Sequence, residues 1–175
     1  MNQDALDAIR ATGGNNAKRF VACPALQASP DSALEAAFVM PKDVEPGRLI
    51  VAVHMYAPYK FAMESPGSVK WNPGFERELT YMFNRLNNTF VQKGYAVYIG
   101  EYGATDKRNV EDRVIWFRAF LRNTKKLGIP CVLWDNGQIM GASGSDFSEK
   151  FGYYNRTKQT WFFPEIIAAI NEETK

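Results

Sequence analysis

The chain has 175 residues, of which 46% are hydrophobic, and its 21 basic and 19 acidic residues give a formal net charge of +2. This length allows one substantial hydrophobic core, and like charges form no blocks that would indicate a nucleic-acid or anionic-membrane partner. The N-terminus lacks a basic segment followed by an apolar one, and no apolar run approaches about 18 residues, so the sequence predicts neither a signal peptide nor a membrane span.

Helical and extended patterns alternate along the chain. Helices are predicted over residues 4–12, 31–37 (a weak patch), 75–93, 110–127 and 158–172. Strands are predicted over residues 19–23, 49–54, 95–99 and 129–134. The strand at 49–54 is almost entirely apolar and rich in branched residues, which is typical of a strand buried on both faces. Four strands, each followed by a helix, after one leading helix, predict an α/β fold with a parallel sheet.

Two architectures fit this order of elements: a small open doubly wound sheet, or part of an eight-stranded (β/α) barrel, which usually takes about 250 residues. In either fold, ligands bind at the carboxyl ends of the strands. Three predicted strand ends carry reactive or aromatic side chains, namely His54 with Tyr56, Glu101 with Tyr102, and Trp134 with Asp135 and Asn136. These ends are therefore the candidate site.

The segments around these strand ends resemble a known family. "VAVHMYAPYKFA", "VYIGEYGATDKRN" and "GIPCVLWDNG" are similar to the sixth, seventh and eighth strands of glycoside hydrolase family 5, the retaining (β/α)8 cellulases, in its bacterial endo-β-1,4-glucanase branch. "LDAIRATGGNNAKRFV" resembles the fourth helix of that branch leading into the fifth strand. The four segments occur in the family's order and cover essentially the whole chain. The resemblance implies half of a TIM barrel, strands five to eight, as a single domain over residues 1–175.

The resemblance also implies roles for individual residues. Glu101 would be the nucleophile, His54 and Tyr56 would orient it and the adjacent sugar, and Trp134 would form the stacking floor beside the cleaved bond. Hydrogen bonds to the charged form favour an ionised carboxylate, and an indole ring offers an apolar face to a sugar ring. Asp135 and Trp71 are further candidates for sugar binding. Each has a structural alternative, since Asp135 also suits a turn before Gly137 and Trp71 also suits core packing.

The second carboxylate of a glycoside hydrolase is missing from the motifs. In the family, the general acid/base is the Glu of an Asn-Glu-Pro motif at the end of the fourth strand, and this sequence contains no Asn-Glu-Pro. Other carboxylates lie in predicted loops or helices, where a solvated surface role is the default; these are Glu64, Glu76, Glu78 and Asp106. Asp146 and Glu149 lie in a Gly/Ser-rich loop after the last strand, which could fold over the cleft, although nothing in the spacing requires it. Losing a general acid costs roughly 10²–10⁴ in rate, so we expect weak or no activity from the chain alone. One His and scattered carboxylates predict no metal site, and no cofactor is implied.

The strands at 19–23 and 129–134 would both be sheet edges with unpaired backbone groups. We therefore expect a homodimer or a complementary N-terminal half-barrel, with a β-glucan polysaccharide as the substrate. In a homodimer, the partner's last strand would bring its Asp135 nearest to the place of the missing acid. The parent enzyme would be extracellular. A non-catalytic half-barrel for glucan binding or assembly, and an unrelated small α/β protein, remain as alternatives. Cys23 and Cys131 are predicted to be small apolar strand residues rather than a disulfide pair.

Overall fold

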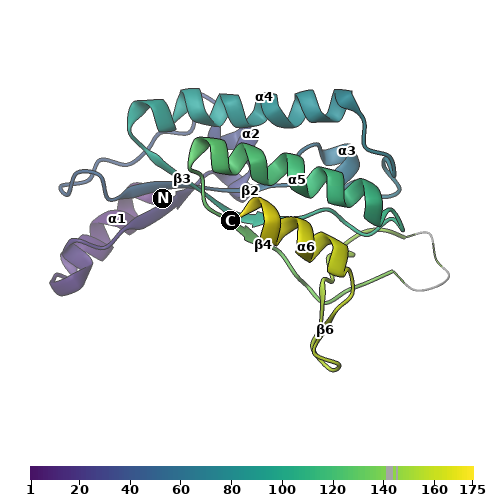
Figure 1. Cartoon of the computed structure of the whole chain (residues 1–175). Helices are drawn as coiled ribbons and strands as arrows, with labels where there is room; N and C mark the ends of the chain where they lie inside the picture. The colour runs from purple at the N-terminus through teal and green to yellow at the C-terminus, as the bar shows by residue number, and fades with distance from the viewer. Residues whose placement is uncertain (141–143, 145) are drawn as a thin grey trace.

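The computed structural model describes residues 1–140, 144 and 146–175 and has the predicted order of elements (Figure 1). The helices are α1 (Asn2–Ala11), α2 (Pro30–Ala33), α3 (Tyr59–Ala62), α4 (Pro73–Thr89), α5 (Val110–Leu127) and α6 (Pro164–Glu173). Short 3-10 turns are η1 (Gly14–Ala17), η2 (Leu26–Ala28) and η3 (Val91–Lys93). The strands are β1 (Val21–Pro24), β2 (Leu49–Met55), β3 (Ala96–Tyr102), β4 (Cys131–Leu133), β5 (Tyr154–Asn155) and β6 (Thr160–Trp161).

The first four strands form one parallel sheet in the order β1-β2-β3-β4. Neighbours in the chain are therefore neighbours in the sheet, and the order never reverses. A doubly wound sheet has a reversal of strand order at its ligand crevice, whereas a barrel adds its strands in sequence. The topology thus supports the barrel alternative, and β1 and β4 are the two edges, as predicted.

One face of the sheet is covered by helices. Along β2, Val51, Val53 and Met55 are fully buried, while the residues between them are half-exposed. The prediction that this strand is buried on both faces is therefore correct for the helix-covered face only. We call the other, half-exposed face the inner face, because it corresponds to the inside of a barrel.

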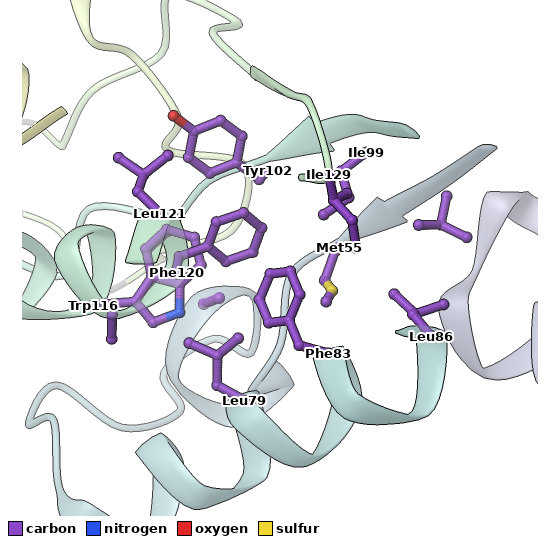
Figure 2. Packing of buried hydrophobic residues seen from close by; sticks show 14 of the residues in the cluster. Met55, Leu79, Phe83, Leu86, Ile99, Tyr102, Trp116, Phe120, Leu121 and Ile129 are labelled. Atoms are coloured by element: carbon purple, nitrogen blue, oxygen red, sulfur yellow. The ribbon is translucent and has the colours of Figure 1, made fainter. Parts of the chain in front are cut away.

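The core lies between the sheet and helices α4 and α5, which pack side by side (Figures 1 and 2). Both helices are amphipathic and direct their apolar stripes at the sheet, as their three-and-four spacing predicts. The ring of Tyr102 from β3 stacks on Phe120 of α5 with centroids 4.7 Å apart. Phe83 of α4 meets the same Phe120 edge-on. These contacts fix the position of β3 relative to both helices.

Several predicted boundaries change. The helix predicted over 75–93 ends at Thr89, the strand over 129–134 is reduced to β4, and the weak patch over 31–37 is the single turn α2. The helix predicted over 158–172 begins only at Pro164, which suits the first turn of a helix because it lacks an N–H. Before it, β5 and β6 form a hairpin that projects away from α4 and α5 (Figure 1).

The remaining sequence expectations concern cysteines and membrane spans. Cys23 is buried against Leu6 and Leu49, Cys131 is half-buried on β4, and both are free thiols. Among the described residues, no helix has the length and apolar character needed to span a membrane.

Candidate active site

The position of Glu101 depends on an irregularity in β3. Val53 pairs with Ile99, but His54, the next residue of β2, pairs with Glu101, so Gly100 is one extra residue in β3. The same shift occurs against β4. Because alternate side chains of a strand point to opposite faces, the extra residue changes the face that Glu101 occupies. Ile99 and Tyr102 both remain in the core, and Glu101 lies beside His54.

Two side chains from β2 and the loop after it meet the Glu101 carboxylate. The Tyr56 hydroxyl donates a hydrogen bond to Glu101 Oε2 over 2.8 Å, and His54 Nδ1 lies 3.2 Å from the same oxygen. The Glu101 side chain is 25% exposed, so it can reach a ligand. Burial raises the pKa of the Tyr56 phenol, and the hydrogen bond to Glu101 raises it further. Tyr56 therefore keeps its proton at neutral pH and acts as a donor.

Glycines on both sides of Glu101 allow other groups to approach closely. A Cβ atom at Gly100 would lie 3.3 Å from Cδ2 and Nε2 of His54, and one at Gly103 would lie 3.2 Å from Cδ1 of Phe151. Both distances are shorter than ordinary van der Waals contact. The "GEYG" pattern thus leaves space for an imidazole on one side of Glu101 and a phenyl ring on the other.

Trp134 follows β4 at the same end of the sheet. Its backbone N–H donates to the Tyr102 carbonyl over 3.0 Å, which extends the β3–β4 pairing past Leu133. Its side chain is 38% exposed, so a face of the ring is accessible. Glu101 and Trp134 therefore occupy neighbouring strand ends, as the sequence predicts. Their roles in catalysis and sugar binding stay predictions.

Asp135 is engaged with the protein itself. Its Oδ1 accepts hydrogen bonds from the backbone of Gly137 over 2.8 Å and Tyr153 over 3.4 Å, and its Oδ2 accepts one from Tyr154 over 3.2 Å. Arg156 lies 3.6 Å from Oδ1. These contacts match the turn-forming alternative, and any contact with a sugar would come in addition to them.

Trp71 lies in the loop between α3 and α4 and packs with other aromatic residues. Its ring centroid is 5.2 Å from that of Phe61 and 6.0 Å from that of Phe75. Its backbone N–H donates to Asp112 over 2.8 Å. The structure does not bring Trp71 into a described contact with Glu101, His54 or Tyr56, and its contacts are those of a packing residue. Sugar binding by Trp71 stays a prediction.

Three of the described carboxylates near the loops of the site have local partners. Asp106 is buried 3.5 Å from Arg113, Asp112 lies 3.1 Å from Lys70, and Asp146 accepts from the backbone of Ser148. The sequence left open whether the loop that carries Glu149 folds over the cleft. The charge of Glu149 raises the pKa of Tyr56 slightly, after burial and the effects of Glu101.

Comparison with known proteins decides the family. Residues 1–139 match the family model described as Cellulase (glycosyl hydrolase family 5). The chain belongs to glycosyl hydrolase family 5. It is 36% identical over 162 residues to Endoglucanase 1 of Ruminococcus albus, an alignment that covers 93% of this chain and 38% of that protein. It is also 38% identical over 172 residues to Endoglucanase A of Clostridium longisporum, covering 97% of this chain and 32% of that protein.

Solved family 5 structures fit the chain along nearly its whole length. A lichenase from Caldicellulosiruptor sp. F32 superimposes with a TM-score of 0.91 at 35% identity, covering 99% of this chain and 48% of that one. A broad-specificity endoglucanase from Ruminococcus champanellensis, solved with bound cellotriose, gives a TM-score of 0.87 at 36% identity and covers 97% and 47%. The chain spans less than half the length of these relatives. Its four βα units are thus half of a family 5 TIM barrel.

Sequence reasoning missed three features of the site: the extra residue in β3, the close approach of Phe151, and the influence of Glu149 on Tyr56. For the first, Gly100 inside an apolar strand was the available signal, since a glycine there often marks a bulge or a close approach. For the other two, the available signal was the Gly/Ser-rich loop after the last strand, which could fold over the cleft, but its path depends on where the segment after β4 returns to the sheet.

Proposed function

We propose that this chain supplies the nucleophile half of a retaining endo-β-1,4-glucanase that hydrolyses β-glucan polysaccharides. The observation that carries the proposal is the Glu101 carboxylate at the end of β3, with Tyr56 at 2.8 Å and His54 at 3.2 Å from one oxygen. That arrangement leaves Oε1 of Glu101 for attack, because both contacts involve Oε2.

In the proposed reaction, a Glu101 oxygen attacks the anomeric carbon and forms a glycosyl ester, while the bond from that carbon to the leaving oxygen breaks. The Tyr56 hydroxyl and His54 hold the carboxylate in one orientation during the attack. Trp134, 38% exposed at the neighbouring strand end, presents an apolar face to the sugar next to the cleaved bond. Water then hydrolyses the ester and releases the sugar.

The leaving oxygen needs a proton, and we propose that a second polypeptide segment supplies it. The inner face of the sheet exposes apolar side chains, with Val132 47% and Trp134 38% exposed, and both edge strands have unpaired sides. A complementary N-terminal half-barrel would cover this face, pair with both edges and bring the acid. A second copy of the chain could close the sheet in the same way, but both oxygens of its Asp135 already accept hydrogen bonds from backbone N–H groups of its own chain.

The test measures hydrolysis of soluble β-glucan by the chain alone and by the chain mixed with the N-terminal half of Endoglucanase 1. We call this combination the mixture of halves. We expect turnover only in the mixture, and its loss in Glu101→Gln. The matched control is Glu78→Gln, which changes an exposed carboxylate on α4 and should leave turnover intact. Undiminished turnover in Glu101→Gln would show that Glu101 is not the nucleophile. Light scattering of the chain alone distinguishes a homodimer from a 19.8 kDa monomer.

We further propose that the assembled enzyme acts outside the cell, because a polysaccharide is too large and polar to cross a lipid bilayer unaided. Fractionation of the source organism followed by detection with an antibody tests this location. Recovery of the protein from the cell interior alone would contradict it.

A further inference from the structure

A segment far along the chain returns to the carboxyl end of β3. We call residues 146–154 the return segment. The Thr105 hydroxyl donates a hydrogen bond to the Phe147 carbonyl and accepts one from the Lys150 N–H over 3.1 Å. The Asp106 N–H donates to the Lys150 carbonyl over 2.8 Å. The return segment is thus fastened by its backbone to the loop that follows Glu101.

The far end of the return segment is held by Tyr153, which is fully buried. Its hydroxyl donates to the Ala104 carbonyl over 3.0 Å and accepts from the Ala104 N–H over 3.2 Å. The Tyr153 backbone N–H also donates to Asp135. The Arg113 guanidinium lies 5.1 Å from the centre of the Tyr153 ring, on the α5 side. Both ends of the segment are therefore fixed to the loops that follow β3 and β4.

Phe151 lies between these two attachments and is 1% exposed. Its ring centroid is 5.4 Å from that of Tyr56, with the planes tilted by 56°. The ring also packs closely against the backbone at Gly103, where an added Cβ would lie only 3.2 Å from Cδ1 of Phe151. Tyr56 itself follows the last residue of β2 and is therefore not held by the ladder of the sheet.

We propose that Phe151 is a positioning residue, which holds the Tyr56 ring so that its hydroxyl points at Glu101 Oε2. A hydrogen bond from a hydroxyl to a carboxylate needs a donor–acceptor distance near 2.5–3.0 Å and good alignment, so a ring free to tilt would lose it. The claim that Phe151 orients Tyr56 towards Glu101 does not depend on any catalytic activity. Its catalytic meaning rests on the proposed function, in which Glu101 is the nucleophile.

The test follows the hydroxyl proton of Tyr56 by proton NMR on the full chain at low temperature. A hydroxyl proton that is hydrogen-bonded to a carboxylate and shielded from water gives a low-field signal that exchanges slowly with solvent. The signal is assigned to Tyr56 if it disappears in Tyr56→Phe, which lacks the hydroxyl. In Phe151→Leu, we expect exchange of this proton to be at least about tenfold faster, equivalent to about 1.4 kcal/mol. Phe90→Leu is the matched control, because Phe90 is 5% exposed and its ring contacts Phe38 rather than Tyr56.

A second variant acts without leaving a cavity. Gly103→Ala places a methyl group 3.2 Å from Cδ1 of Phe151, so the ring must shift, and the shift should change the exchange rate of the Tyr56 proton. The proposal is overturned if the signal is absent from the wild type, or if Phe151→Leu and Gly103→Ala both leave its exchange unchanged while the chain stays folded. This signal does not depend on glucan turnover. A positioned Tyr56 in a protein that never hydrolyses glucan would refute the proposed function and leave this inference standing.

Discussion

His54 and Glu101 are register partners across β2 and β3, although strict alternation from Ile99 would place Glu101 on the helix-covered face. The extra residue Gly100 produces this pairing, and its missing side chain leaves room for the His54 ring. Glu101, the proposed nucleophile, thus owes its position to a bulge. Bulges are common beside active sites because they redirect a side chain without interrupting the sheet.

Gly100→Ala tests the need for this space. The added Cβ would lie 3.3 Å from two atoms of the imidazole, so His54 must shift by a few tenths of an ångström. We expect the distance from His54 Nδ1 to Glu101 Oε2 to exceed its present 3.2 Å in a crystal structure of the variant. Turnover by the mixture of halves should fall about tenfold, which corresponds to about 1.4 kcal/mol of transition-state stabilisation. An unchanged distance together with full turnover would contradict the prediction.

Trp134→Ala tests sugar stacking. Removing the ring should weaken binding of cellotetraose to the mixture of halves by roughly tenfold, because an apolar contact face is lost. Trp161→Ala is the matched control, since Trp161 is 47% exposed but lies on the β5–β6 hairpin beside Tyr154. Isothermal titration calorimetry provides the affinities. Equal losses in the two variants would argue against a specific platform at Trp134.

Val132→Lys tests whether the inner face is an assembly surface. Val132 is 47% exposed on β4, so the change should alter the free energy of unfolding of the chain by no more than about 0.5 kcal/mol. A charge on this face should nevertheless prevent assembly with a complementary half and abolish turnover. Val44→Lys, at an 84% exposed loop position, should affect neither property. Sedimentation of the mixtures measures assembly, and normal assembly of Val132→Lys would exclude this face.

Lys107 should make stability depend on pH in the alkaline range. It is 3% exposed, donates to the Phe61 carbonyl, and burial lowers its pKa to about 8. An unfolded Lys has a pKa of about 10.4, so between these values the unfolded chain binds more protons and stability rises with pH. Relative to Lys107→Met, the wild type should gain up to about 3 kcal/mol between pH 7 and pH 10.

Guanidinium unfolding of both proteins at the two pH values measures this gain. Effects of other titrating groups are common to both proteins and cancel in the comparison. Lys125→Met, at an exposed position on α5, should show no such change relative to the wild type. A pH-independent difference between wild type and Lys107→Met would mean that the Lys107 ammonium stays charged throughout.

Asp43 should make stability depend on pH in the acidic range. Arg10 donates two hydrogen bonds to its carboxylate, over 2.6 Å and 2.9 Å, and these lower the pKa of Asp43 below its ordinary value. The stabilisation is therefore complete above about pH 4, where an unfolded Asp ionises, and is lost as the pH falls through the lowered value. Asp43→Asn should destabilise the chain at pH 7 and become equivalent to wild type at strongly acidic pH.

Urea unfolding across this pH range provides the comparison for Asp43. Asp31→Asn is the control, because Asp31 is 70% exposed and lies 3.9 Å from Arg85, beyond hydrogen-bond distance. It should change stability little at any pH. A constant deficit of Asp43→Asn down to the acid limit would assign the effect to packing rather than charge.

The sequence predicted those parts of the fold that depend on local periodicity. The apolar stripes of α4 and α5 and the apolar run of β2 consist of side chains that each element buries against its neighbours. Their spacing can therefore be recognised from the sequence of each element alone. The barrel order, and the roles proposed for Glu101, His54 and Tyr56, came from the resemblance of whole segments to a family. The position of His54 and Tyr56 beside Glu101 agrees with that resemblance.

Other features were not predictable because they depend on distant parts of the chain. The bulge at Gly100 is defined only relative to the partner strands. The contact of Phe151 with Tyr56 and the hydrogen bonds of Asp135 depend on the path of the return segment. The helix predicted from residue 158 wrongly includes β6, because two-residue strands are too short to show an alternating pattern beside the helical pattern of α6.

The return segment affects the order in which parts of the chain fold during synthesis. Tyr56 and Phe151 are far apart in the sequence, whereas the packing of α4 and α5 on β2 and β3 uses residues that are synthesised earlier. Contacts between distant residues form slowly, because the intervening chain must first lose its freedom. During synthesis, the sheet can therefore assemble around Glu101 well before Tyr56 is held against it. The growing polypeptide would carry a folded sheet in which Tyr56 is not yet held against Glu101 until the return segment emerges and docks.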